Sequence, residues 1–175
     1  DIIFQKNNKK KLYGKNIGLI FEKPSTRTRL SFLVGISQLG ANSLEIKYSD
    51  LNIVRQESFE DTFRAMNCYL DGLIIRTTDH QKLLNATKYF KKPIINALSE
   101  ISHPCQAISD IYTLYHHFNS LKLNILWIGD MNNVCFSLAE CVNIIDEINL
   151  TILTPNIISS NIEWTLNDNI SVKKD

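Results

Sequence analysis

Short apolar runs rich in β-branched residues alternate along this chain with longer stretches of helical periodicity, and this alternation limits the fold more than any other feature. The apolar runs show no polar–apolar alternation, which is typical of strands covered on both faces. Strands and helices in this order predict an α/β protein with a mostly parallel sheet. The expected strands are residues 17–21, 43–46, 73–76, 93–96, 124–128 and 150–153. The expected helices are residues 25–39, 58–70, 81–90, 104–118 and 133–145, with a weaker helical stretch at 163–166.

Several residues mark where these helices begin and end. Ser58, with Asp61 three residues later, resembles a capping box, which satisfies free backbone donors at a helix start. Pro104 suits the first position of a helix, where its missing N–H group costs nothing. Gly40 lies where the first long helix should stop, because glycine readily adopts the left-handed conformation of a helix end.

The expected helix 104–118 carries an apolar stripe formed by Ile108, Ile111, Tyr112 and Tyr115. A stripe at this spacing lies on one face of a helix. We therefore expect this helix to pack against a substantial apolar surface.

Asn119 and Ser120 interrupt the helical pattern, and a new apolar run begins shortly after them. We place the domain boundary there, so that residues 1–120 form the first domain and helix 104–118 links it to the second. Residues 121–175 hold two expected strands and one clear helix, which is the beginning of a doubly wound domain. Because the chain lacks an initiator Met and ends in mid-domain, we expect it to be trimmed at its start and incomplete at its end.

The charge balance excludes several classes of partner. The chain of 175 residues has 19 basic and 18 acidic side chains, a formal net charge of +1. This balance gives no electrostatic basis for binding nucleic acid or an anionic membrane surface. No apolar stretch reaches the roughly 20 residues that span a bilayer. The four cysteines, none in a C-x-x-C pair, indicate neither a zinc site nor a disulfide framework and favour a reducing, cytoplasmic location.

The segment Ser25-Thr26-Arg27-Thr28-Arg29 lies between the first expected strand and the first expected helix. A helix start carries free N–H groups and partial positive charge. Hydroxyl groups and planar guanidinium groups add donors that match the oxygens of a phosphate. The segment therefore predicts a binding site for an oxyanion, most plausibly a phosphate.

Three more polar clusters follow strands, at 76–77, 103–106 and 129–133. Open α/β sheets bind ligands just outside the carboxyl ends of their strands, so we expect these clusters to converge with residues 25–29 on one crevice. Each cluster taken alone has a structural explanation, such as a surface arginine, a helix cap or a turn. Their placement at successive strand ends favours the functional interpretation.

Other chemistries fit poorly. The sequence has no G-x-x-x-x-G-K-[ST] loop for a nucleoside triphosphate, and Gly129 lacks the further glycines of a dinucleotide fingerprint. It has no closely spaced metal ligands of the H-E-x-x-H type and no serine-hydrolase elbow. No base is placed to activate Cys105, which we expect to be a small buried or half-buried residue and not a nucleophile.

The motifs at residues 21–29, 71–76, 103–106 and 129–133, taken in order, closely resemble those of the ornithine carbamoyltransferases, within the aspartate/ornithine carbamoyltransferase family. The resemblance implies a parallel-sheet carbamoyl-phosphate-binding domain followed by the start of an ornithine-binding domain. It implies carbamoyl transfer from carbamoyl phosphate to the δ-amino group of L-ornithine, giving L-citrulline and phosphate. This reaction belongs to arginine biosynthesis or to urea and arginine metabolism, and it needs no cofactor and no metal.

The resemblance also implies roles for particular residues. The residues matching the carbamoyl-phosphate site are Ser25, Thr26, Arg27, Thr28, Arg76, His103 and Gln106. Among them, Arg76 and His103 match the catalytic residues that polarise the carbamoyl carbonyl. Asn133 matches a residue that holds ornithine.

Family members form trimers, in which a loop from a neighbouring subunit reaches each active site. Asn52 lies where several relatives carry a longer glutamine or histidine for this contact. The two downstream segments with which ornithine enzymes hold the acceptor do not occur in these residues. Two alternatives therefore stay open: a non-catalytic fragment that binds only carbamoyl phosphate or phosphate, and an enzyme that acts on putrescine or another amine.

Overall fold

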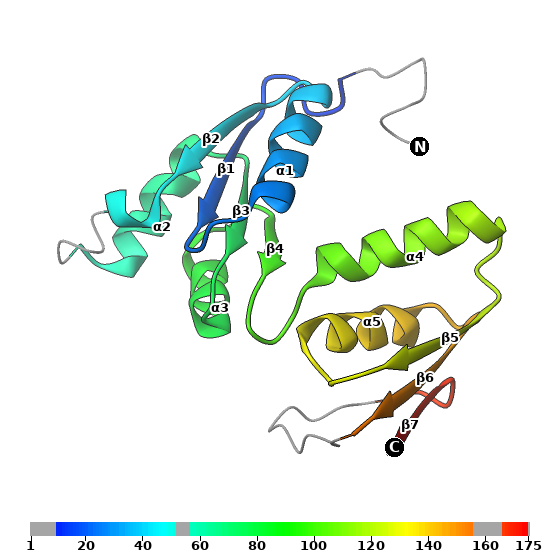
Figure 1. Ribbon diagram of the computed structural model, residues 1–175. Helices are drawn as coiled ribbons and strands as arrows, with labels where there is room; N and C mark the ends of the chain where they lie inside the picture. The colour runs from blue at the N-terminus through cyan, green and yellow to red at the C-terminus, as the bar shows by residue number, and fades with distance from the viewer. Residues whose placement is uncertain (1–9, 52–56, 156–165, 175) are drawn as a thin grey trace. The chain divides into compact units, whose positions relative to one another are not determined.

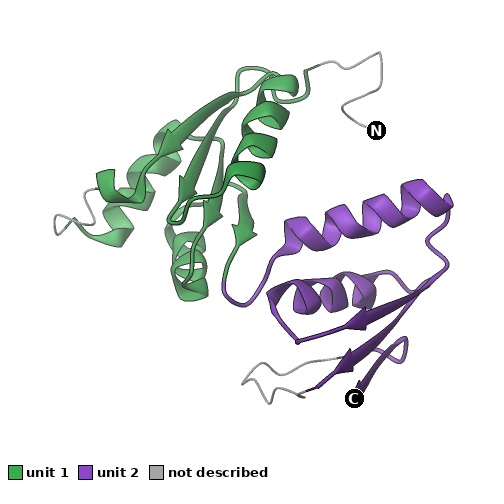
Figure 2. Cartoon of the chain, in the orientation of Figure 1, with its two compact units in different colours: residues 1–99 green, residues 100–175 purple. Residues whose placement is uncertain are grey.

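The computed structural model describes residues 10–51, 57–155 and 166–174, and it is an α/β protein built on parallel sheets (Figure 1). The contacts of the chain divide it into two compact units, residues 1–99 and residues 100–175 (Figure 2). Each unit has its own sheet. The predicted fold class is therefore confirmed.

The first unit holds a four-stranded sheet in the order β2-β1-β3-β4, in which all neighbouring strands are parallel. Its strands are β1 (Asn16–Phe21), β2 (Asn42–Ile46), β3 (Gly72–Arg76) and β4 (Ile94–Leu98). Its helices are α1 (Thr26–Gln38), the short 3-10 helix η1 (Tyr48–Asp50), α2 (Phe59–Tyr69) and α3 (His80–Tyr89). The sequence predicted each of these strands and the three α-helices to within a few residues.

Adjacent residues of the central strands point to opposite faces of this sheet, and each face has its own core. Leu19 and Ile74 pack with Ile36 of α1 on one face. On the other face, Ile20 and Ile75 belong to a cluster that also contains side chains of α2 and α3. Because both faces of β1 and β3 are covered, the absence of polar–apolar alternation in these strands is explained.

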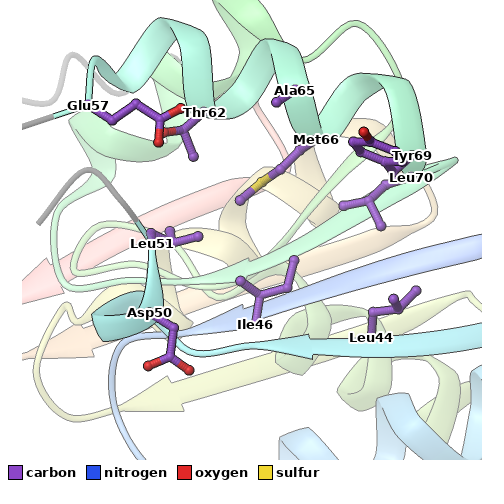
Figure 3. A pocket seen from close by; sticks show the side chains of 10 residues that line it. All are labelled: Leu44, Ile46, Asp50, Leu51, Glu57, Thr62, Ala65, Met66, Tyr69 and Leu70. Carbon is purple, nitrogen blue, oxygen red and sulfur yellow. The ribbon is translucent and has the colours of Figure 1, made fainter. Parts of the chain in front are cut away.

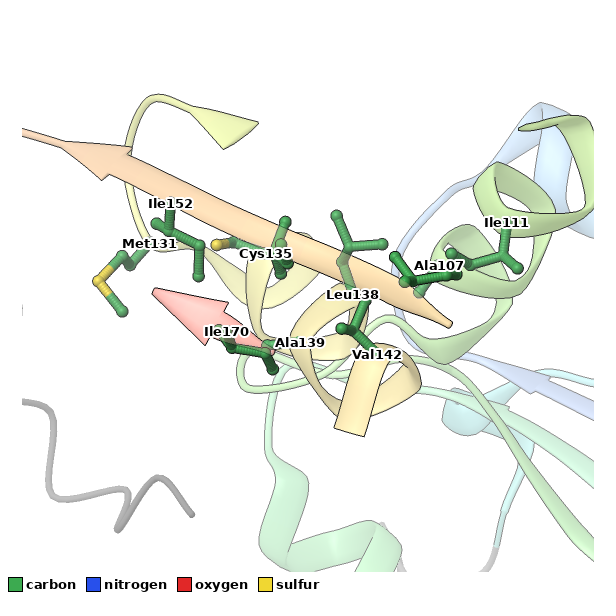
Figure 4. Packing of buried hydrophobic residues seen from close by; sticks show 11 residues of the cluster. Ala107, Ile111, Met131, Cys135, Leu138, Ala139, Val142, Ile152 and Ile170 are labelled. Atoms are coloured by element: carbon green, nitrogen blue, oxygen red, sulfur yellow. The ribbon is translucent and has the colours of Figure 1, made fainter. Parts of the chain in front are cut away.

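The second unit holds a three-stranded parallel sheet in the order β5-β6-β7. Its elements are α4 (Pro104–Phe118), β5 (Leu123–Ile128), α5 (Asn133–Ile144), β6 (Ile148–Thr154) and β7 (Ile170–Lys174). Figure 4 shows its core, where Leu138 and Val142 of α5 meet Ala107 and Ile111 of α4. Side chains of β6 and β7 complete this cluster.

The strand β7 is a finding that the sequence analysis missed, because it expected only two strands in this region. Ile170–Lys174 contains only two apolar residues, Ile170 and Val172, so its strand pattern is short and weak. Pairing with β6 makes it a strand, from Leu150 opposite Ile170 to Thr154 opposite Lys174. Of the weak helical stretch expected at 163–166, only Leu166 lies within the described residues, and it is not helical.

The expectation that every strand is covered on both faces is wrong for two strands. Most of β2 is exposed, because it forms an edge of its sheet. Along β5, half-buried and exposed residues alternate, and the exposed set includes Leu126 and Ile128. An apolar residue in a strand therefore did not by itself predict burial.

The apolar stripe expected to be buried along α4 is also largely exposed in the part of the chain that the structure describes. Ile108, Tyr112 and Tyr115 are exposed, whereas Ile111 is buried. The face of α4 that packs on α5 instead contains Ala107, which is fully buried.

The domain assignment at residue 120 stays a prediction. Internal contacts separate the chain after Ser99, and α4 packs on α5 within the second unit. The predicted boundary instead follows α4, at the break Asn119–Ser120. Asn119 has a left-handed conformation with φ of 51°, which ends α4 as the sequence indicated.

Candidate functional site

The ends of β1 and β3 lie side by side, and each carries predicted ligand-binding residues. Phe21, the last residue of β1, is the register partner of Arg76, the last residue of β3. After β1 the chain passes through residues 22–25 into α1. The guanidinium Nη1 of Arg76 lies 3.4 Å from the hydroxyl of Thr28 in the first turn of α1. The fold thus brings together two of the predicted clusters that are 48 residues apart in the sequence.

Arg76 has donor capacity that the described residues do not use. Its Nε atom is buried and has no hydrogen-bond partner among the residues that the structure describes. Buried N–H donors are rarely left unpaired in folded proteins, because an unmade bond costs about 1–3 kcal/mol. An anion bound beside α1 would satisfy this donor.

The start of α1 is unusual in leaving its capping side chain unused. Ser58, Asp79 and Asn132 each accept a hydrogen bond from a backbone N–H in the helix that they precede. Ser25 is the N-cap of α1, yet its side chain makes no capping bond, and the first turn of α1 contains no acidic residue. The helix start therefore keeps both its N–H donors and a hydroxyl group available to an anion.

A pocket of about 650 Å³ opens beside this helix start. Four of its lining residues are basic: Lys23, Arg29, Lys47 and Lys82. Ser25 also lines it, whereas Thr26 and Arg27 are exposed residues outside the lining. Its basic character favours an anionic ligand, although Arg29 is already paired with Glu45 at 3.4 Å.

Glu22 is a residue of this site to which the sequence analysis gave no role. Its carboxylate accepts hydrogen bonds from Lys82 Nζ at 2.8 Å and from Thr77 Oγ1 at 2.6 Å. Burial raises the pKa of Glu22, but the bonds from Lys82 and Thr77 outweigh it and hold that pKa below its usual value. The pKa of Lys82 is raised in turn by its bond to Glu22. A single sequence has no signal for this network, because its members come from three separate elements.

The predicted residues of the second unit occupy two helix starts. His103 is the N-cap of α4 without a capping side-chain bond, and Pro104 is in the first turn, as predicted. The backbone N–H of His103 donates to the buried hydroxyl of Ser137 on α5 at 2.8 Å. Gln106 is exposed and donates to Asp110 at 2.9 Å. Ser137 was missed because it lies in mid-helix with no motif around it.

Asn133 is the first residue of α5 and follows Asn132, which caps that helix. These residues come directly after the turn at Gly129, whose φ of 136° lies in the region that favours glycine. The convergence of His103, Gln106 and Asn133 with the residues of the first unit on one ligand stays a prediction. Asn52 lies outside the described residues.

A second pocket, of about 360 Å³, lies between β2 and α2 and is mainly apolar (Figure 3). Leu44 and Ile46 of β2 face Met66 and Leu70 of α2 across it. None of the predicted site residues that the structure describes lines this pocket, and its apolar character does not suit a small anion.

The described residues contain no group of three His, Cys, Asp or Glu side chains that could hold a metal ion. Within the same residues, no helix is long and apolar enough to cross a membrane. None of the four cysteines forms a disulfide, and Cys105 is half-buried, one of the two states that the sequence predicted. Burial raises the pKa of Cys105, and it raises that of Cys135 to about 11, so neither thiol is activated as a nucleophile.

The structure is an α/β protein whose first helix starts without a side-chain cap beside a pocket with basic lining residues, and comparison with known proteins gives its class. Residues 2–116 match the family model of the aspartate/ornithine carbamoyltransferase carbamoyl-P binding domain. The chain therefore belongs to the aspartate/ornithine carbamoyltransferase family.

Individual relatives agree with this assignment. An ornithine carbamoyltransferase of Aquifex aeolicus is 49% identical over 131 residues, which is 74% of this chain and 43% of the relative. The crystal structure of the Burkholderia thailandensis ornithine carbamoyltransferase superposes with a TM-score of 0.83 at 31% identity, covering 93% of this chain and 57% of that one. The catalytic subunit of M. jannaschii aspartate transcarbamoylase superposes with a TM-score of 0.75 at 26% identity, covering 97% of this chain and 58% of that one. The chain thus spans less than half the length of the first relative and little more than half of these structures.

Proposed function

We propose that this chain is the carbamoyl-phosphate-binding part of an ornithine carbamoyltransferase. The reaction is transfer of the carbamoyl group from carbamoyl phosphate to the δ-amino group of L-ornithine, giving L-citrulline and phosphate. The observation that carries the proposal is the donor set at the start of α1 that the described residues leave unused: Ser25 makes no capping bond, and Arg76, whose Nη1 lies 3.4 Å from Thr28 in the first turn, has a buried Nε without a partner. In a chain of this family, carbamoyl phosphate is the ligand that such a donor set suits.

In this proposal the phosphate group of carbamoyl phosphate binds at the start of α1. Ser25, Thr26, Arg27 and Thr28 supply hydroxyl, guanidinium and backbone N–H donors there. Arg76 adds its planar guanidinium group from β3. The exposed side chain of Arg27 turns onto the ligand when it binds.

Catalysis follows from where charge develops during the transfer. The uncharged δ-amino group attacks the carbamoyl carbon, and negative charge grows first on the carbonyl oxygen and then on the departing phosphate. Arg76 and His103 polarise the carbonyl, with Gln106 at the same end of the ligand. Fixed donors aimed at these oxygens stabilise the transition state more than the substrates. Holding both reactants together lowers the barrier further.

The choice of ornithine as acceptor rests on a sequence motif and on the names of the relatives. The segment 129–133 resembles the ornithine branch of the family, and Asn133 in it holds the amino acid. The Aquifex aeolicus relative and the Burkholderia thailandensis structure are both ornithine carbamoyltransferases. We place the reaction in arginine biosynthesis and the protein in the cytoplasm, working as a trimer in which Asn52 contacts the ligand of a neighbouring subunit.

Calorimetry and a product assay test this proposal. The chain should bind carbamoyl phosphate, and the gene product read to its natural end should release citrulline from carbamoyl phosphate and ornithine. Putrescine in place of ornithine serves as the competing acceptor. Absence of carbamoyl-phosphate binding would overturn the donor site. Binding without citrulline formation by the complete product would favour the non-catalytic alternative, and faster reaction with putrescine would overturn the acceptor.

A further inference from the structure

We infer that Glu22 is a positioning residue of the phosphate site, which ties the loop 22–25 to the end of β3. It thereby sets the distance between the start of α1 and Arg76. The inference rests on the proposed function in one respect, since it takes the start of α1 as the place where phosphate binds. Glu22 itself touches no substrate in this proposal.

Both the backbone and the side chain of Glu22 are held on the segment that follows β3. Its N–H donates to the carbonyl oxygen of Arg76 at 3.0 Å. Its Oε2 accepts from the hydroxyl of Thr77 at 2.6 Å and from the N–H of Thr78 at 3.4 Å. The side chain is only 12% exposed. These bonds attach Glu22, the first residue of the loop 22–25, to Arg76, Thr77 and Thr78.

Thr77 makes this attachment rigid. The residue is 2% exposed, and its N–H donates to the carbonyl oxygen of Leu98 in β4 at 3.0 Å. Its hydroxyl donates to Glu22 and also accepts from the N–H of Asp79 at 3.1 Å. Asp79 in turn caps α3 through the N–H of Gln81. Glu22 is therefore anchored to β4 and α3 as well as to β3.

Lys82 offsets the negative charge of Glu22, which lies beside the proposed anion site. A bare negative charge there would repel phosphate, but Lys82 Nζ lies 2.8 Å from Oε1 of Glu22. The same ammonium group lies 4.7 Å from the ring centroid of Tyr48, and all three residues line the basic pocket. The ion pair compensates the charge of Glu22 through Oε1. Oε2 still accepts the bonds from Thr77 and Thr78 that hold the loop.

Charge and position predict opposite effects of removing this carboxylate. If only charge mattered, Glu22→Ala and Glu22→Gln would both bind phosphate more tightly, because each removes a negative charge close to the anion. If Glu22 positions the loop, Glu22→Ala binds phosphate more weakly. Glu22→Gln then lies between the wild type and Glu22→Ala, because its amide oxygen still accepts from Thr77.

The test measures the binding of inorganic phosphate and of carbamoyl phosphate to the chain by calorimetry. We expect Glu22→Ala to weaken both by about 10- to 100-fold, as a small displacement of a binding group does. The matched control is Glu45→Ala, which also removes a carboxylate paired with a basic residue of the pocket but makes no bond to the loop. We expect this control to bind phosphate as well as the wild type or slightly better.

A second pair of variants tests the same inference without any change of charge. Thr77→Val removes the hydroxyl that Glu22 accepts from and should weaken phosphate binding, whereas Thr77→Ser retains it and should not. This pair decides the question if Glu22→Ala does not fold. Equal or tighter phosphate binding by folded Glu22→Ala or Thr77→Val would overturn the positioning role.

A measurement without ligand separates this inference from the proposed function. In the NMR spectrum the Nε–H signal of Arg76 should move in Glu22→Gln and stay unchanged in Glu45→Ala. If the wild-type chain binds no phosphate, the proposed function fails, and this signal alone decides whether Glu22 sets the position of Arg76. An unmoved signal in Glu22→Gln would then refute the inference.

Discussion

At the level of single residues, the candidate site combines polar groups that are already hydrogen-bonded with polar groups that the described residues leave unpaired. The carboxylate of Glu22 accepts from both Lys82 and Thr77, so these three residues hold the site together. Among the described residues, the hydroxyl of Ser25 makes no capping bond and the buried Nε of Arg76 has no partner, so both are suited to binding a ligand. The sequence motifs suggested roles for Ser25 and Arg76 but none for Glu22, although Glu22 lies in the motif 21–29, because its bonds to Thr77 and Lys82 depend on the fold.

Arg27 gives the first prediction. Arg27→Ala should weaken carbamoyl-phosphate binding by about 1.5–3 kcal/mol, roughly 10- to 100-fold, because a charge-assisted hydrogen bond to phosphate is lost. Calorimetry measures the change. Arg64→Ala is the matched control, since it removes an exposed arginine that pairs with Glu60 one helical turn away. Equal affinity of Arg27→Ala and the control would show that Arg27 is an ordinary surface residue.

The Glu22 carboxylate gives a prediction for acid stability. Its pKa lies below the usual value in the folded protein because hydrogen bonds from Lys82 and Thr77 outweigh its burial. The ionised form therefore stabilises the fold at pH values above the ordinary glutamate pKa of about 4.3, and this contribution disappears as pH falls through the lower folded value. The free energy of unfolding should fall more steeply below about pH 5 for wild type than for Glu22→Gln. Urea titrations at several pH values measure both curves, and parallel curves would contradict the assignment.

At the scale of elements, capping separates the helices into two groups. Three helices, α2, α3 and α5, begin with a side chain that accepts from the first turn. The helices α1 and α4 do not, and these are the two whose N-cap residues, Ser25 and His103, were predicted to bind ligand. Capping and ligand binding use the same N–H groups, so a helix start free of its own cap is suited to binding.

Asn132 gives the prediction at this scale. Its side chain accepts from the N–H groups of Val134 and Cys135 at 3.0 and 3.2 Å. Asn132→Ala should lower the free energy of unfolding by about 0.5–2 kcal/mol, the usual cost of removing such a cap. Asn132→Ser retains an acceptor and should recover most of the loss, as chemical denaturation can measure. A full loss in the serine variant would show that Asn132 stabilises the fold by some means other than capping.

Strands with a continuous apolar run of their own were predictable. Such runs located the buried strands β1 and β3. β7 was missed because Ile170 and Val172 are its only apolar residues, and its identity comes from pairing with β6. A strand at the edge of a sheet depends on its neighbour more than on its own composition.

At the scale of the whole molecule, the chain consists of two units, each with its own parallel sheet and its own core. Residues that we assign to carbamoyl phosphate occur in both. Ser25 and Arg76 belong to the first unit, and His103 and Gln106 belong to the second. The proposed reaction therefore needs both units and, through Asn52, a neighbouring subunit.

The proposed trimer gives the last prediction. Light scattering during size-exclusion chromatography should report a mass of about 60 kDa, three times the 20.1 kDa of one chain. Asn52→Ala should weaken carbamoyl-phosphate binding without changing this mass, because it removes one ligand contact and not the interface. A mass near 20 kDa would contradict the trimer, and unchanged binding would contradict the role of Asn52.

The sequence alone was enough to predict the fold class, most helices and strands, and candidate residues of a family site, because periodicity and contiguous motifs are local properties. The folded structure was needed to show that β7 is a strand, that Ile108 and Leu126 are exposed, and that Glu22 bonds to Thr77 and Lys82. The physical reason is the same in each case. Strand pairing, burial and hydrogen bonds between distant residues depend on what lies opposite in space, and one sequence does not record those neighbours.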